Sequence, residues 1–229
     1  MERIRKLGLL LVLLLLLTLA VSGCQQALLT ALVLVNGTDV KPKYEILLKG
    51  EKRVAVVCRS VASNPYDVQN APREISRQIS KLIDLKVRNK KLKVIEPAKI
   101  ETWLDNCNND FDNFLEIGRD KTINADIVIG IEIRGFQMRD PHSPYLVQGK
   151  CQVNVKAIDC SNGEVLVSED LMIIDPPNIP MSGGPGLEAE FRPRFIQVVS
   201  EQIAILFHHH DPHSKRIDAD NLDMHRLQY

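Results

Sequence analysis

The densest group of metal-binding residue types is the segment at residues 208–213, which holds four histidines and Asp211. Imidazole and carboxylate groups are the ligands that zinc and copper take in proteins. Neighbouring histidines at a helix end point in different directions, however, and none of the four has helical i, i+4 spacing within a stable element. We therefore interpret the segment as a solvated helix end, where imidazole meets the negative end of the helix dipole, and we predict no metal site.

An acid–base set is the second candidate for chemistry, and it would combine Asp126, Glu132, Asp140 and His142. These residues lie along or just after a predicted strand, and ligands bind at the carboxyl ends of strands in α/β folds. No nucleophile stands at a telling spacing from them. Cys58, at the end of the first predicted strand, is a candidate nucleophile, but a disulfide is the commoner role of such a cysteine in an exported protein. We predict no catalytic residues, and a hydrolase with a polar pocket at Cys58, Asp126 and Asp140 remains an alternative.

The glycine-rich segment at residues 183–186, Gly-Gly-Pro-Gly, precedes a predicted helix, as a phosphate-binding loop does. It lacks the Lys and Ser/Thr of a P-loop and the spacing of a dinucleotide fingerprint. We interpret the segment as a flexible connection and predict no cofactor.

The stretch Val21-Ser22-Gly23-Cys24 closes an apolar run that follows three basic residues. A charged start, an apolar run and small residues before a cleavage point are the layout of a secretory signal. The stretch resembles the lipobox of bacterial lipoproteins, which implies that Cys24 carries the lipid, palmitate included, and becomes the first residue of the mature protein. The apolar run has about 15 residues, whereas a membrane span needs roughly 20, so a cleaved signal is favoured over an uncleaved anchor.

Charge and composition restrict the partners. The chain of 229 residues has 29 basic and 29 acidic residues, and aromatic residues make up 5% of it. Nucleic acid or anionic lipid as the main partner would call for a basic excess, and a stacking platform for more aromatic residues. The predicted organisation is a signal peptide at 1–23, a lipid-anchored tether at 24–49, an α/β domain at 50–207 and a polar tail at 208–229.

Four cysteines remain once Cys24 is set aside, and an even number in an exported domain predicts disulfides. Cys151 and Cys160 are nine residues apart on one predicted strand, about 30 Å when extended, so they cannot pair with each other. From the predicted directions of the strands and helices we expect the pairs Cys58–Cys151 and Cys107–Cys160.

Hydrophobic patterning predicts an α/β fold. Continuous apolar runs predict buried strands at 53–58, 92–95 and 127–133, and alternation predicts a hairpin at 146–158 and 164–174 around an Asn-Gly turn. Helical spacing predicts helices at 72–86, 97–104, 112–122 and 187–207. The expected fold is a three-layer sandwich with a mixed five-stranded sheet, in which three parallel strands precede an antiparallel C-terminal hairpin and helices cover both faces.

The third strand and its neighbours carry a family resemblance. Asn-Ala-Asp-Ile-Val-Ile-Gly-Ile-Glu at residues 124–132 resembles a strand shared by curli secretion channel lipoproteins, the amino-terminal domain of the Tol propeller protein and lipoprotein activators of penicillin-binding proteins. Lys-Arg-Val-Ala-Val-Val at 52–57, the helix from Pro72, Lys-Val-Ile-Glu-Pro at 93–97 and Asn-Gly-Glu-Val at 162–165 are similar too. The resemblance covers residues 50–206. It implies a lipid-anchored domain without enzymatic activity that forms rings or docks a partner.

The long membrane-spanning hairpins of the curli channel are not evident in the sequence, which favours an accessory or scaffold role. We expect a non-catalytic lipoprotein that faces the periplasm, on the outer membrane rather than the inner one, and binds an envelope protein or itself. A subunit of a ring-forming secretion complex is the first alternative and a hydrolase the second. The expected contact surfaces are two loops, at residues 134–145 and 175–186. The residues expected to contact the partner are Arg139, Asp140, His142 and Tyr145.

Overall fold

The computed structural model describes residues 39–61, 70–107, 111, 113–140, 143–176, 181–182 and 187–211. The chain separates into two units. One unit, Lys41–His209, contains the sheet and its helices. The other unit combines Met1–Val40 and His210–Tyr229. In it Val40 and His210 form an antiparallel bridge, in which each backbone N–H donates to the carbonyl of the other residue, at N to O distances of 2.7 and 3.1 Å. None of the helices in the described residues is long and apolar enough to cross a membrane.

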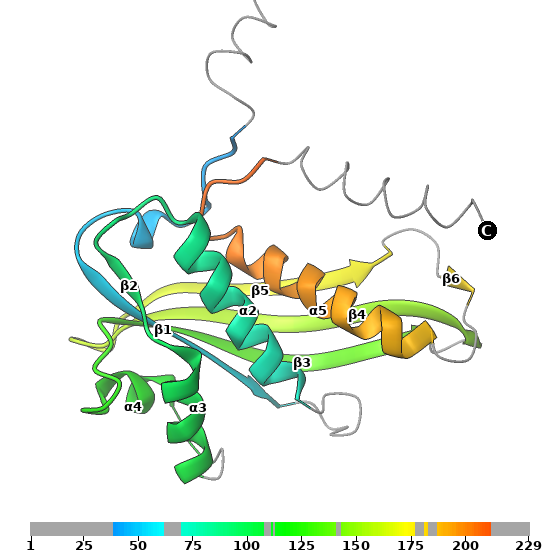
Figure 1. The fold of residues 1–229 in the computed structure, drawn as a ribbon, viewed down its shortest axis with the longest axis horizontal. Helices are drawn as coiled ribbons and strands as arrows, with labels where there is room; N and C mark the ends of the chain where they lie inside the picture. Colours follow the sequence, from blue (N-terminus) through cyan, green and yellow to red (C-terminus); the bar gives the residue numbers. More distant parts are fainter. Residues whose placement is uncertain are drawn as a thin grey trace, which may run out of the picture. The chain divides into compact units, whose positions relative to one another are not determined.

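The sheet is mixed, and its strand order is β2-β1-β3-β4-β5 (Figure 1). β1 is parallel to both β2 and β3, whereas β3, β4 and β5 are antiparallel neighbours. A short strand, β6, also pairs with β4. The predicted mixed sheet, with three parallel strands and an antiparallel hairpin, is therefore confirmed. The strands are β1 (Lys52–Ser60), β2 (Leu92–Val94), β3 (Ile127–Asp140), β4 (Ser143–Asp159), β5 (Val165–Asp175) and β6 (Met181–Ser182).

Two long helices, α2 (Ala71–Lys86) and α5 (Leu187–Ala204), cover one face of the sheet (Figure 1). α2 has Pro72 in its first turn, where the missing N–H costs no hydrogen bond. Its buried isoleucines recur every four residues and so form one apolar stripe, and α5 buries aromatic and branched side chains. The buried side chains that the helices contribute here include Ile75, Ile79, Ile83, Phe195, Val199 and Ile203.

A smaller core lies on the other face, under α3 (Pro97–Asn106) and α4 (Phe114–Arg119). Alternate residues of a strand point to opposite faces, so β1 supplies Val56 to the larger core and Ala55 and Val57 to the smaller one. The two separate cores confirm the prediction of helices on both faces of the sheet.

Two glycines in the strands make room for aromatic rings. A Cβ atom added at Gly130 would overlap the ring of Phe114, and one added at Gly149 would overlap the ring of Phe195. Each ring therefore packs directly on the backbone of a strand, one on each face of the sheet. Because glycine has no side chain, it leaves space on the strand that a neighbouring aromatic ring can fill.

The prediction of a long loop between the third and fourth strands is wrong, because most of these residues are in strands. β3 continues to Asp140, and β4 begins at Ser143. Irregularities in the β3–β4 register, the first between Ile133 and Gly135, bend this hairpin without ending it. The second expected loop is also partly wrong, because Met181–Ser182 forms β6 against β4.

The packed unit begins before residue 50 and ends after residue 207. A short 3-10 helix, η1 (Glu45–Leu47), buries Leu47 completely, and the backbone N–H of Tyr44 donates to the carbonyl of Leu206 at 2.9 Å. His208 is 3% exposed, so the expectation of a solvated helix end is wrong for this residue. Residues 41–49, expected to be tether, and the first tail residues are thus part of the packed unit.

The structure contains neither predicted disulfide, since Cys58, Cys107, Cys151 and Cys160 are free thiols. β3 lies between β1 and β4, which separates the Cα atoms of Cys58 and Cys151 by at least two strand spacings, about 9.5 Å, beyond the reach of a disulfide. Cys160 is buried in the smaller core, whereas Cys107 is half-buried and lines a surface cavity. The predicted pairs neglected the strand that intervenes and the depth of each side chain.

Candidate functional site

Polar side chains line the outer side of β3–β5, on the face of the sheet that also carries α4. We define the open sheet face by eight residues of this side. The register places Glu132 of β3 opposite Asn154 of β4, and Asn154 opposite Asp170 of β5, so polar side chains form a line across three strands. The residues of the open sheet face are Glu132, Arg134, Gln152, Asn154, Lys156, Ser168, Asp170 and Met172.

Glu132 is the centre of an ion cluster at the inner end of this face. One carboxylate oxygen accepts a bond of 2.5 Å from the Arg59 guanidinium, and the other lies 3.6 Å from Lys156 Nζ. Burial by itself would raise the pKa of Glu132, but the hydrogen bond from Arg59 and the charge of Lys156 together hold this pKa below its usual value. Glu132 is therefore ionised at neutral pH and fixes both cations.

The guanidinium of Arg59 also contacts the helical cover. It donates to the carbonyl of Phe111 at 2.8 Å and lies 5.1 and 5.0 Å from the ring centroids of Phe111 and Phe114. Arginine stacks on aromatic rings and binds carboxylates through the same planar group. Arg59 therefore links the smaller core to the ion cluster on the open sheet face.

Asp170 organises the outer end of the face. Its Oδ1 atom accepts from Arg134 at 3.0 Å and from the amide of Asn154 at 2.9 Å. Arg134 reaches this carboxylate from β3, across β4. Next to it Met172 is 56% exposed, an apolar side chain among paired charges. The face therefore presents fixed charges around an accessible thioether.

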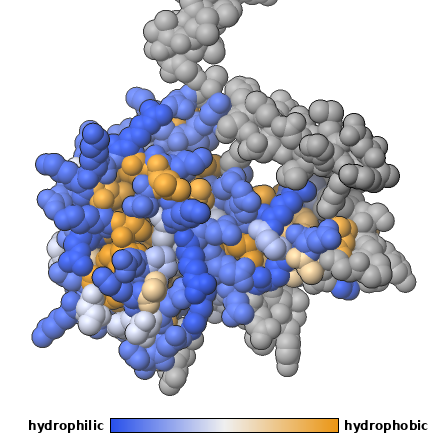
Figure 2. All heavy atoms as spheres, viewed as in Figure 1, coloured by the Kyte–Doolittle hydropathy of each residue, from blue (hydrophilic) through white to orange (hydrophobic). Residues whose placement is uncertain are grey.

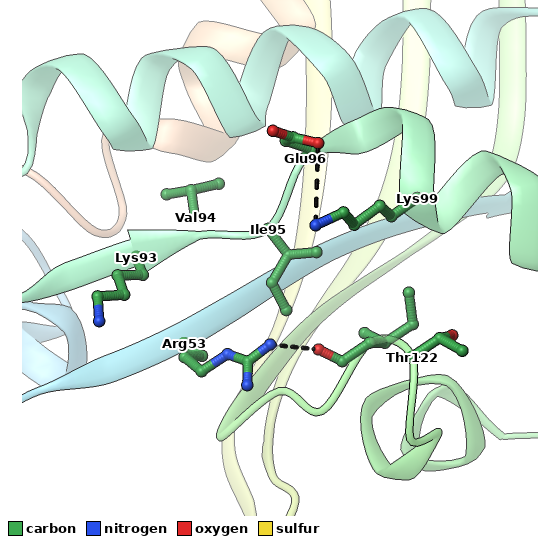
Figure 3. A pocket seen from close by; sticks show the side chains of 8 residues that line it. Arg53, Lys93, Val94, Ile95, Glu96, Lys99 and Thr122 are labelled. Carbon is green, nitrogen blue, oxygen red and sulfur yellow. Dashed lines mark hydrogen bonds and ion pairs between the residues drawn. The ribbon is translucent and has the colours of Figure 1, made fainter.

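Two surface cavities lie along α3 and share Lys99 and Thr122. The first, of about 360 Å³, is at the beginning of the helix and is lined by basic side chains (Figure 3). The second, of about 500 Å³, is at the other end and is lined by Trp103, Cys107 and Asp120. Hydrogen bonds from Thr122 lower the pKa of Asp120.

The four residues expected to contact a partner fall on the β3–β4 hairpin. Arg139 is exposed on β3 and pairs in register with Val147, and Asp140 pairs with Ser143. The side chains of Asp140 and Tyr145, and all of His142, lie outside the described residues. The expected surface is thus strand at Arg139 and Asp140 rather than loop.

The candidate acid–base set, from which no catalytic residues are predicted, is not brought together as far as its residues are described. Asp126 precedes β3 and Asp140 is its last residue, so the 14 residues of the strand, at most roughly 45 Å, separate them, and the Asp126 carboxylate accepts from the backbone N–H of Arg53 at 2.7 Å. Cys58 belongs to the larger core, where burial, with a smaller effect from nearby Cys151, raises the pKa of its thiol well above the ordinary value. A buried thiol with a raised pKa is a poor nucleophile. Among the described side chains, Cys58 and Asp126 therefore do not form the polar pocket that the hydrolase alternative requires, and the side chain of Asp140 lies outside them.

The histidine segment divides at the boundary between the two units. His208 is buried in one unit, and His210 pairs with Val40 in the other, while His213 lies outside the described residues. Within the part of the chain that the structure describes, no three His, Cys, Asp or Glu side chains are arranged to hold a metal ion.

Sequence reasoning missed Arg59, Phe111 and Phe114 as parts of the site. One signal was available: Arg59 follows Ala55 and Val57 at the two-residue period of a strand, and Glu132 interrupts an apolar run. Two opposite charges on the same face of neighbouring parallel strands can form an ion pair where the register places them side by side. The register that makes them neighbours, Arg59 opposite Glu132, is visible only in the structure.

No family model matches the chain, and no curated protein matches it. Solved structures with a similar fold include the lipoprotein GNA1162 of Neisseria meningitidis, at 13% identity over 66% of this chain and 97% of that one, with a TM-score of 0.42. The PelC dodecamer of Paraburkholderia phytofirmans is 12% identical over 73% and 94%, with a TM-score of 0.41. The LpoB C-terminal domain of Escherichia coli is 10% identical over 54% and 82%, with a TM-score of 0.33. At these scores and identities the likenesses say nothing about partners or activity.

Proposed function

We propose that the chain is a non-catalytic lipoprotein of the cell envelope, anchored through Cys24, whose α/β domain binds a protein partner with its open sheet face. The anchor follows from the Ser-Gly-Cys end of the apolar run, where a lipid on Cys24 would hold the domain at a membrane. The periplasmic side of the outer membrane is the proposed location.

The asymmetry of the sheet is the observation that carries the recognition role. The inner side of β3 and β4 lies in the larger core, where α5 packs against β4, and its residues Val153 and Val155 are fully buried. On the outer side, by contrast, Asp170 keeps 65% of its side-chain surface and Arg134 keeps 42%, although Asn154 between them is 3% exposed. The face that carries α2 and α5 is itself mostly hydrophilic where the chain is described, with smaller apolar areas (Figure 2).

The arrangement suits a protein better than a small molecule. Small ligands bind in concave, mostly apolar pockets, whereas the open sheet face is a strand surface on which charged groups already bind one another. Fixed charges around an accessible Met172 match the polar rim and methionine-containing centre of protein interfaces. Prearranged charges favour specificity and association rate over affinity.

Site-specific photocrosslinking in cells tests the proposal. A photoreactive residue at Gln152 or Met172, both exposed on the open sheet face, is expected to give a discrete protein adduct. The same residue at Lys81, exposed on α2, is the matched control and is expected to give none. Equal adducts from both faces, or none from the open sheet face, would contradict the assignment of the surface.

The ring-forming alternative makes a different prediction for the purified protein. Light scattering after size exclusion, with the detergent mass subtracted, would give a large fixed oligomer for a ring subunit. A partner-binding lipoprotein is expected to be a monomer under the same conditions. A self-adduct at Gln152 together with a large oligomer would replace the proposed function with the ring.

A further inference from the structure

The 360 Å³ cavity at the beginning of α3 collects three cations from three elements. They are Arg53 of β1, Lys93 of β2 and Lys99 of α3, and Ile95 and Ile123 supply apolar walls. Figure 3 shows these three basic side chains on the three elements. From these residues we propose that the cavity binds a phosphate-type oxyanion, either a phosphomonoester or a phosphodiester.

The placement of Arg53 and Lys93 is unfavourable without an anion. The register makes them direct neighbours on parallel strands, so both side chains leave the sheet on the same side. Like charges directly opposite each other destabilise a sheet. Lys93 is 3.4 Å from Glu51, but both side chains are more than 60% exposed, and an exposed pair of this kind contributes little.

Arg53 is held in position but not neutralised. Its Nη2 atom donates to the carbonyl of Ile123 at 2.9 Å, which fixes the guanidinium at the cavity. Within the described residues no carboxylate is ion-paired with its guanidinium, and the nearby Asp126 carboxylate accepts from the backbone N–H of Arg53 instead, at 2.7 Å. Arginine presents several donors in a planar fork that matches phosphate geometry, so the remaining donors are available to an oxyanion.

Lys99, the third cation, also has an electrostatically unfavourable position. It lies in the first turn of α3, near the positive end of the helix dipole, where an acidic residue would be stabilising. Of the described residues that line the cavity, Glu96 is the one carboxylate, and its oxygen is 4.0 Å from Lys99 Nζ in an exposed pair. One anion in the cavity would relieve the repulsion between the two strand cations and the mismatch at the helix start together.

The cavity is larger than a phosphate group and open to solvent, so the anion has room for a substituent. A soluble phosphate ester and a phospholipid headgroup present the same chemistry to these residues. The two sources differ in where they are found, and the test separates them.

The test uses the full-length protein in nanodiscs of zwitterionic phosphatidylcholine. The midpoint temperature of thermal unfolding, called the midpoint below, is measured as sodium phosphate is added at constant ionic strength. A phosphate-dependent rise in the midpoint is expected, since a ligand that binds the native state stabilises it. Lys93→Gln is expected to raise the midpoint without phosphate, because it removes a like-charge neighbour, and to weaken phosphate binding about tenfold. Lys99→Gln should weaken binding similarly, and Lys81→Gln on α2 should change neither quantity.

A second set of nanodiscs contains anionic phosphatidylglycerol. A lipid headgroup is identified as the occupant if three results hold in these nanodiscs. The midpoint is already high, phosphate no longer raises it, and Lys93→Gln lowers it. An equal response to phosphate in both lipids identifies a soluble phosphate compound. The proposal is overturned if phosphate and phosphatidylglycerol both leave the midpoint unchanged, or if Lys93→Gln and Lys81→Gln respond alike.

Discussion

Replacing Glu132 with glutamine tests whether the ion cluster holds the open sheet face in place. The substitution keeps the shape of the side chain and removes its charge. Glu132 is 13% exposed in its side chain and Arg59 is 25% exposed, so the guanidinium is left partly buried without its carboxylate. Lys156 also loses its carboxylate at 3.6 Å.

The expected loss is about 1–3 kcal/mol of unfolding free energy at pH 7. A hydrogen bond to a charged group contributes about 1.5–3 kcal/mol, and an uncompensated buried charge costs more. The partial exposure of Arg59 reduces this loss, and the more exposed Lys156 adds little to it. The contacts of Arg59 with Phe111 and Phe114 do not depend on the charge of Glu132 and are expected to remain.

The loss should depend on pH in a defined direction. The pKa of Glu132 is lower in the folded protein than in the unfolded chain, so its ionised form stabilises the fold. This stabilisation is complete above the unfolded pKa of about 4.3 and disappears as the pH falls through the lower folded pKa. Glutamine does not titrate, so the wild type and Glu132→Gln should converge in stability in acid.

Urea denaturation of the purified protein at a series of pH values measures this difference. Glu164→Gln is the control, because Glu164 is exposed at the β4–β5 turn, and a change within about 0.5 kcal/mol is expected there. A Glu132→Gln protein as stable as the wild type at pH 7 would refute the account of the cluster. A difference that stays constant down to acid would refute the role of the charge.

Two further predictions concern the packing of the cores. Gly130→Ala should lower the free energy of unfolding by about 1–3 kcal/mol, measured by thermal unfolding, because its Cβ atom overlaps the ring of Phe114. Gly135→Ala should be nearly neutral, because the atom nearest to its Cβ atom is 3.8 Å away. Equal effects of the two substitutions would contradict the described packing. Cys107 should react with iodoacetamide in the native protein, while Cys151, which is fully buried and whose pKa burial raises to about 12, should react only after denaturation. Mass spectrometry of a digest prepared without reductant measures whether each of the two cysteines is alkylated. A disulfide at either cysteine would contradict the free thiols of the structure.

The fold was largely accessible from local patterns. The apolar run of β1 and the four-residue spacing of α2 predicted elements that the structure contains, because burial on one or both faces leaves its period in the sequence. The sequence pattern predicts an end of β3 that is too early, because Gly135 follows the apolar run. Alternating Phe136 and Met138, which pack in or against the larger core, carried the signal that the strand continues.

The candidate sites were less accessible, because they depend on register. Arg59 opposite Glu132 and Arg53 opposite Lys93 are neighbours only once β1 has paired with β3 and β2. The alternating apolar pattern says which face of a strand is buried but not which residue of the neighbouring strand lies opposite. The disulfide prediction was wrong for the same reason, since the position of β3 between β1 and β4 is a property of the whole sheet.

Lipid anchoring through Cys24 is the central claim, and Cys24→Ser tests it most directly. Cells that express the wild type or the variant are labelled with palmitate, lysed and separated into membrane and soluble fractions. The account predicts that the wild type is labelled and found in the membrane fraction, while Cys24→Ser is unlabelled and soluble. An unlabelled wild type, or a variant that stays in the membrane fraction, would contradict the account and favour an uncleaved anchor.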